Sequence, residues 1–223
     1  MTRRGIATLL LPLLVAGLAC GSTPPPPTLG PLPDFTMPPA WTPTPEFVAH
    51  SIPGWETFTG RGLELMMPPS YGGGDPVALA EELADLLAEV PEYAALAEAV
   101  RNDPSGYRLL IIDRETGSTV AVTSNDVPSA VSMTEYVDKF SAAVVEQAPG
   151  SALIQKGVIP FRDGEAGWML FEFTLEEVAA WQLTYALRRG DQVWNLNYGA
   201  VREDYPRLQP MFDQSLQTVH FTP

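Results

Sequence analysis

The feature that most constrains this chain is the division of its N-terminal region at Cys20, the only cysteine. Residues 2–4 include two arginines, and an apolar run occupies residues 6–19. A basic start, a short apolar run and small residues at its end are typical of a secretory signal peptide. The run is shorter than the roughly 20 apolar residues that a membrane-spanning helix needs. We therefore expect residues 1–19 to be removed, so that the mature chain begins at Cys20.

The sequence Gly17-Leu18-Ala19-Cys20 resembles the lipobox of bacterial lipoproteins, in which the cut precedes the cysteine and its thiol carries diacylglycerol. Ala19 fits the small residue before the cut, whereas Gly17 replaces the usual leucine. A lone free thiol is unusual in an exported protein, and a lipid on the sulfur accounts for it. Acyl chains such as palmitate, at about 0.8 kcal/mol per buried methylene, would anchor the chain to the extracytoplasmic face of a bacterial membrane. A plain secretory signal and a twin-arginine export signal remain as alternatives.

Residues 20–50 are predicted to be a proline-rich tether that begins at the lipidated cysteine. Residues 21–45 read GSTPPPPTLGPLPDFTMPPAWTPTP. Proline removes backbone donors and favours an extended polyproline II chain, which at about 3.1 Å per residue would reach roughly 75 Å. A peptide ligand for an aromatic-lined module is the alternative interpretation. About 175 residues then remain, which is enough for one domain at 51–223.

The charge of the chain limits its partners. It carries 13 Lys and Arg against 27 Asp and Glu, a net charge of −14, and removal of residues 1–19 makes this −16 by deleting two arginines. Such a surface is repelled by nucleic acid and by anionic lipid head groups. We therefore expect no nucleic-acid role, and we expect membrane contact to come from the lipid on Cys20 rather than from a basic face.

Periodicity and turn signals predict the elements of the domain. A helix pair should open with Asp75 as N-cap after Gly72–Gly74, a capping box at Ser132–Glu135 should start a second helix, and Pro210 should lie in the first turn of a closing helix over about 210–219. The predicted strands are 55–58, 63–67, 107–113, 119–123, 153–159, 167–174, 180–187 and 192–198.

This order predicts an α+β fold, with a central antiparallel sheet flanked by helices in an α/β/α sandwich. The strand-then-proline-then-aromatic start LELMMPPSY and the closing helix PMFDQSLQTVHF are similar to those of the PsbP-like fold family, named for an extrinsic subunit of photosystem II. The family's metal-binding residues have no counterparts in this chain, so the photosynthetic role does not carry over. The family also includes a nuclear-transport factor that binds a small GTPase, so the resemblance implies the fold and leaves the function open.

Catalytic and metal-binding constellations are not evident in the sequence, and we expect neither an enzyme nor a cofactor. The two histidines, His50 and His220, are 170 residues apart, and no Gly-x-Ser-x-Gly elbow occurs. Calcium ligands could come from residues 163–165 or 172–177, which are more simply a turn and a solvated strand end. Glu172, Glu176 and Glu177 would be the residues of a carboxylate-based enzyme, the least favoured alternative.

Aromatic residues of the predicted strands are the remaining candidate site. They could line a ligand groove on one sheet face, although such stripes more often form helix-covered core; the five are Trp168, Trp181, Tyr185, Trp194 and Tyr198. The leading hypothesis is a lipid-anchored extracytoplasmic module that binds or scaffolds an envelope protein whose identity the sequence does not give. The alternative hypothesis is a carrier of a small hydrophobic ligand on the aromatic face.

Overall fold

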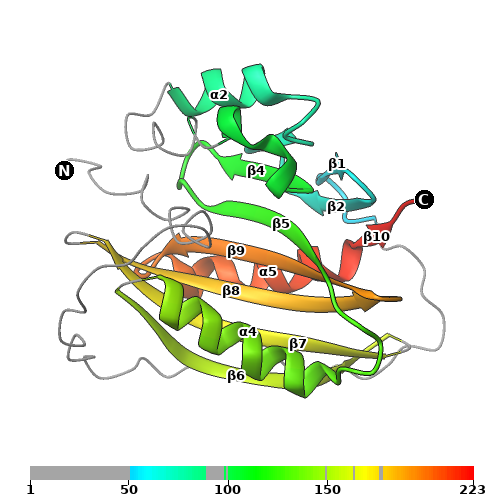
Figure 1. The fold of residues 1–223 in the computed structure, drawn as a ribbon. Coiled ribbons are helices and arrows are strands. Elements are labelled where there is room, and N and C mark those ends of the chain that lie inside the picture. The colour runs from blue at the N-terminus through cyan, green and yellow to red at the C-terminus, as the bar shows by residue number, and fades with distance from the viewer. Residues whose placement is uncertain (1–50, 89–97, 99, 149, 163, 176–177) are drawn as a thin grey trace.

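The computed structural model describes residues 51–88, 98, 100–148, 150–162, 164–175 and 178–223. The predicted signal peptide, the tether and most of the segment from 89 to 99 lie outside these residues. The described elements, drawn in Figure 1, are β1 Glu56–Gly60, β2 Leu63–Met67, β3 Tyr71–Gly74, α2 Ala80–Ala88, η4 Pro104–Gly106, β4 Leu109–Asp113, β5 Thr119–Asp126, α4 Met133–Gln147, β6 Ser151–Phe161, β7 Gly164–Leu175, β8 Val178–Arg189, β9 Gln192–Val201, α5 Tyr205–Thr218 and β10 His220–Phe221.

The strands form two antiparallel sheets. The large sheet has the order β3-β4-β5-β9-β8-β7-β6, and the small one has the order β1-β2-β10. Helix α4 packs on β6 and β7, whereas α5 packs on β9 and on β2 of the small sheet; in Figure 1 the two helices lie on opposite faces of the large sheet. This arrangement confirms the predicted α+β class with a central antiparallel sheet flanked by helices.

Strand alternation divides the core into two halves. In the pairing of β7 with β8, Trp168 lies opposite Tyr185, and these side chains belong to the core under α5. The next pair along, Met169 and Thr184, points to the other face, where Met169 packs in the core under α4. Because both faces are buried at the centre of the sheet, a central strand such as β9 needs side chains suited to burial at successive positions.

The face on the side of α4 carries a buried polar network on β8 and β9. Thr184 Oγ1 and Gln182 Nε2 donate to Asn197 Oδ1 at 2.8 and 3.2 Å. Next to them, Asn195 Nδ2 donates to the Tyr136 hydroxyl of α4 at 2.8 Å. Since these side chains satisfy one another, the network fixes the position of α4 on the sheet rather than leaving buried polar atoms unpaired.

The predicted helix entry after the three glycines is wrong. Gly72, Gly73 and Gly74 continue β3, which pairs with β4, and α2 begins only at Ala80. Gly73 has a φ of +124°, and a Cβ there would lie 2.4 Å from the carbonyl oxygen of Leu110. The absence of side chains at this strand edge therefore lets the backbones approach closely.

Two helix predictions had different outcomes. The N-cap at Ser132 is confirmed, because Ser132 Oγ accepts from the backbone N–H of Glu135 at 3.1 Å, whereas the Glu135 carboxylate accepts from Lys139 Nζ at 2.7 Å. The placement of Pro210 in the first turn of the last helix is wrong, because α5 begins at Tyr205, with Pro206 near its start. The helix therefore starts one turn earlier than predicted and carries Pro210 inside it, where the missing N–H leaves one carbonyl of the preceding turn without its helical donor.

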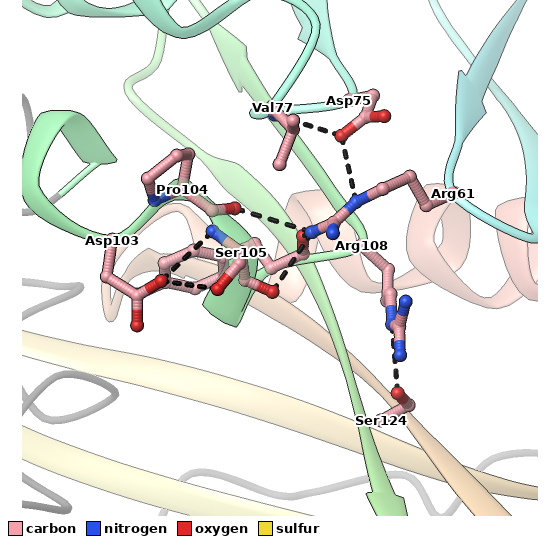
Figure 2. Close-up of polar contacts among 9 residues, drawn as sticks. Arg61, Asp75, Val77, Asp103, Pro104, Ser105, Arg108 and Ser124 are labelled. Atoms are coloured by element: carbon pink, nitrogen blue, oxygen red, sulfur yellow. Dashed lines mark hydrogen bonds and ion pairs between the residues drawn. The ribbon is translucent and has the colours of Figure 1, made fainter.

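The guanidinium of Arg61 joins the small sheet to the large one (Figure 2). Its Nε lies 3.1 Å from Asp75 Oδ1, just after β3. Its Nη2 donates to the carbonyls of Pro104, at 3.4 Å, and Ser105, at 3.0 Å, and also to that of Tyr107. These carbonyls lead into β4, so one side chain connects the β1–β2 turn to both strands at that edge of the large sheet.

We predict that Arg61→Ala lowers the free energy of unfolding by about 2–4 kcal/mol, because it leaves carbonyls and Asp75 without their charged donor. Urea denaturation of the variant measures this. Arg101→Ala is the control, since its ion pair with Asp85 is long, at 3.9 Å, and exposed, and its loss should cost less than about 0.5 kcal/mol. Equal losses in the two variants would contradict a role for Arg61 in joining the sheets.

Candidate functional site

A cleft of about 620 Å³ opens at one end of the large sheet. It lies where the β6–β7 turn, the end of β8, the start of α4 and strand β10 meet. Its floor is buried and apolar, consisting of Met133, Phe161 and Leu187. Its rim includes exposed side chains such as Ser129 and Glu165. The volume falls in the range of about 300–1,000 Å³ that is usual for specific ligand sites.

Arg188, at the end of β8, is half-buried in the wall of the cleft. Its Nη1 donates to the carbonyls of Val127 and Pro128 at 3.1 and 3.4 Å, and its Nη2 donates to that of Val131 at 2.6 Å. The segment 127–131 connects β5 to α4, so the guanidinium holds this connection against the end of the sheet. A guanidinium has five N–H donors, and these contacts use three of them.

Arg162, in the β6–β7 turn, contributes the second guanidinium. Its Nη2 donates to the carbonyls of Gln217 and Val219 at 3.1 and 2.7 Å, at the C-terminal end of α5, where a cation is favourable. The guanidinium also lies over the ring of Phe161, 4.8 Å from its centre. The backbone φ of Arg162 is +52°, a conformation that side-chain-bearing residues seldom adopt. The turn therefore places this cation at the cleft at some conformational cost.

The cleft combines cations and hydroxyl groups over an apolar floor. Its described lining contains no histidine or cysteine, and no group of three His, Cys, Asp or Glu that could hold a metal occurs among the described residues. Guanidinium groups recognise carboxylates and other oxyanions, and the floor accepts an apolar group. The arrangement can therefore bind an anionic, partly apolar ligand, whereas a nucleophile–base pair is not part of its described lining.

The five predicted aromatic residues lie in the core and not in the cleft. Trp168, Trp181, Tyr185, Trp194 and Tyr198 are each at most 4% exposed and belong to one cluster with α5. The structure thus places them as helix-covered core, the more common role of such stripes, and shows no open groove along them within the described residues. The hydroxyl of Tyr185 donates to Asp213 Oδ1 of α5 at 2.7 Å. Burial raises the pKa of both tyrosines.

The structure brings few of the other candidate residues together. Glu172 is buried, accepts from Trp181 Nε1 at 2.8 Å and lies 3.4 Å from Arg202, so it is engaged within the domain. Glu165 lies on the rim of the cleft. Cys20, His50, Asp163, Glu176 and Glu177 lie outside the described residues. His220 is exposed on β10, opposite Glu64 of β2.

Arg162 and Arg188 were not among the site residues predicted from the sequence. The two residues are 26 positions apart; Arg162 follows β6 and Arg188 lies near the end of β8, so only the antiparallel pairing of β6, β7 and β8 brings these strand ends to one side of the sheet. The available signal was the position of each arginine next to a turn in a chain with few cations.

Comparison with known proteins defines the fold class. No protein-family model matches the chain, and no curated protein matches it. Among solved structures, cyanobacterial PsbP (CyanoP) from Synechocystis sp. PCC 6803 is 13% identical, with a TM-score of 0.53 over 77% of this chain and 95% of that one. The chain therefore has a PsbP-like fold, which its sequence pattern had indicated.

Two further solved structures are more distant. The Ran-binding protein Mog1p of Saccharomyces cerevisiae is 8% identical, with a TM-score of 0.46 over 72% of this chain and 90% of that one. LpqN of Mycobacterium tuberculosis, described as involved in cell envelope biogenesis, is 11% identical, with a TM-score of 0.45 over 76% and 91%. At such identities the likeness concerns the fold and not the activity.

Within the ranges that the structure covers, no helix is long and apolar enough to cross a membrane.

We predict a pH-dependent effect of Asp213→Asn. Burial raises the pKa of the Asp213 carboxyl, and the hydrogen bond from Tyr185 lowers it in part. The folded state therefore holds this proton more tightly than the unfolded chain, so wild-type stability falls as the pH rises from about 4 through the raised pKa. Asparagine still accepts from Tyr185 and cannot ionise, so the stability advantage of Asp213→Asn should grow between about pH 4 and pH 7.

Thermal unfolding of wild type and Asp213→Asn at a series of pH values measures this difference. Tyr185→Phe is the companion variant, because it removes the donor to Asp213 and should make the loss of stability with rising pH larger than in wild type. A difference between wild type and Asp213→Asn that does not change with pH would show that the carboxyl is not destabilised by its burial.

Proposed function

We propose that this protein is a lipid-anchored extracytoplasmic module that binds another component of a bacterial cell envelope, without catalysing a reaction. The membrane part of the proposal is supported by the secretory signal and by the lipobox-like sequence that ends at Cys20. The proline-rich residues 21–45 supply the reach by which a folded domain could act away from the bilayer.

The cleft at the end of the sheet carries the binding part of the proposal. Its two arginines emerge from strand ends and rest on backbone carbonyls, over a floor of buried apolar side chains. Rigid strands therefore hold the recognition groups at fixed positions, as specific binding requires. The carboxylate enzyme is disfavoured at Glu172, because this residue is buried and its Oε2 is engaged by both Trp181 and Arg202. The ligand carrier is disfavoured by the burial of the aromatic face.

Detergent phase partition tests the anchor. Wild-type protein expressed in a bacterium should enter the detergent phase, and Cys20→Ala should move to the aqueous phase, because the variant has no thiol to carry diacylglycerol. Gly17→Leu is the matched control, since it restores the usual lipobox residue and should partition like wild type. Wild type in the aqueous phase, or Cys20→Ala unchanged in the detergent phase, would contradict lipid anchoring.

A further inference from the structure

We propose that the cleft binds a peptide segment in which a carboxylate lies next to an apolar side chain, with the carboxylate on Arg188 and the apolar side chain on the floor. This inference rests on the proposed binding function and specifies the chemical class of its ligand. The partner would present an acidic–apolar segment, either as an exposed loop or as a chain end.

The hydrogen-bond inventory of Arg188 leaves two donors for a ligand. Three carbonyl contacts account for both N–H groups of Nη1 and one of Nη2, leaving Nε and the second N–H of Nη2. A guanidinium offers carboxylates such pairs of donors in a planar fork. The contacts in the domain thus orient the group and leave part of it able to receive an oxyanion.

The charge of Arg188 is not balanced by a carboxylate in the described domain. Six Lys and Arg residues form ion pairs there, and Arg188 is not among them, although acidic residues outnumber basic ones by two to one. Acidic residues at this end of the sheet form no ion pair with Arg188 among the described residues: Glu165 lies on the rim of the same cleft, Asp191 Oδ1 accepts from the N–H of Ser129 at 3.0 Å, and Asp126 Oδ1 accepts from Gln192 at 3.1 Å. A half-buried cation without a counter-ion favours an anionic ligand.

The floor and the overall charge select a peptide rather than a membrane surface. Met133, Phe161 and Leu187 are at most 7% exposed, and they line the cleft together with the arginines. An anionic bilayer would be repelled by a domain of such high negative charge. A single carboxylate on a short segment meets the guanidinium locally, while its apolar neighbour gains by leaving water.

Gly164 on the rim offers a way to block the cleft without disturbing the fold. A Cβ built there meets no atom within 4 Å, and the residue does not have a positive φ. Gly164→Trp should therefore fold normally and project a large side chain over the opening.

Fluorescence anisotropy with labelled peptides tests the proposal on the mature chain, residues 20–223, carrying Cys20→Ala. The probes are a panel of short acidic–apolar peptides built around Leu-Glu-Leu, each with a counterpart in which glutamine replaces glutamate. We expect at least one glutamate peptide to bind at least about tenfold more tightly than its glutamine counterpart, because only glutamate carries the charge. Arg188→Gln and Gly164→Trp should each lose that preference or the binding itself.

The matched control is Arg114→Gln. Arg114 is an exposed arginine of the β4–β5 turn, so its replacement removes the same charge away from the cleft and should leave binding unchanged. Should Arg188→Gln fail to fold, since its loop carbonyls lose their donor, Gly164→Trp and Arg188→Lys test the proposal. Lysine keeps the positive charge but lacks the planar pair of donors, so Arg188→Lys should bind the glutamate peptide more weakly than wild type.

Three results would overturn the proposal: no peptide of the panel binds at millimolar concentration, glutamate and glutamine peptides bind equally, or Gly164→Trp binds like wild type. Displacement of a bound peptide by decanoate, with decanoate binding more tightly than any peptide, would assign the cleft to lipid-like anions instead and also overturn it. If no peptide binds while detergent partition still depends on Cys20, the proposed peptide ligand is wrong, whereas the proposal of a lipid-anchored module is not contradicted.

Discussion

Burial of the large sheet on both faces is the constraint on which the rest of the structure depends. Antiparallel sheets often leave one face in water, but β9 is buried at every position between its two ends. The side facing α5 is met by aromatic and aliphatic residues, and the side facing α4 by a polar network around Asn197. Because side chains occupy both faces, the cleft lies at an end of the sheet, where strands stop and turns begin.

The same constraint decides what the sequence could predict. Period-two alternation indicates a strand whatever covers its faces. The central residues of the four long strands from Ser151 onward were therefore predicted correctly. The alternation does not show whether a helix covers a sheet face. The sequence therefore left open whether the five aromatic residues line a groove or lie in the core. Gly72–Gly74 were misassigned because glycine indicates both flexible turns and close backbone approach, and only the pairing with β4 distinguishes the two.

Four arginines of this acidic chain hold backbone carbonyls at the ends of elements and in the connections between them. Arg61 holds the connection into β4, Arg162 the end of α5, Arg188 the loop before α4, and Arg189 the carbonyl of Thr222. Connections between elements leave carbonyls without partners, and a long charged fork can satisfy several of them at once. The candidate site escaped prediction for this reason: its arginines do not form a motif along the chain, and they meet only after the strands pair.

An arginine that holds backbone carbonyls can also bind a ligand when its charge and some of its N–H donors have no partner within the domain. Arg61 has the carboxylate of Asp75 as well as three carbonyls, so its charge is balanced within the domain. Arg188 has the three carbonyls without the carboxylate. Carbonyl dipoles fix the position of a guanidinium but do not neutralise it, so the charge remains as a fixed feature of the cleft. The contrast between these two arginines is therefore the physical basis for assigning a structural role to one and a recognition role to the other.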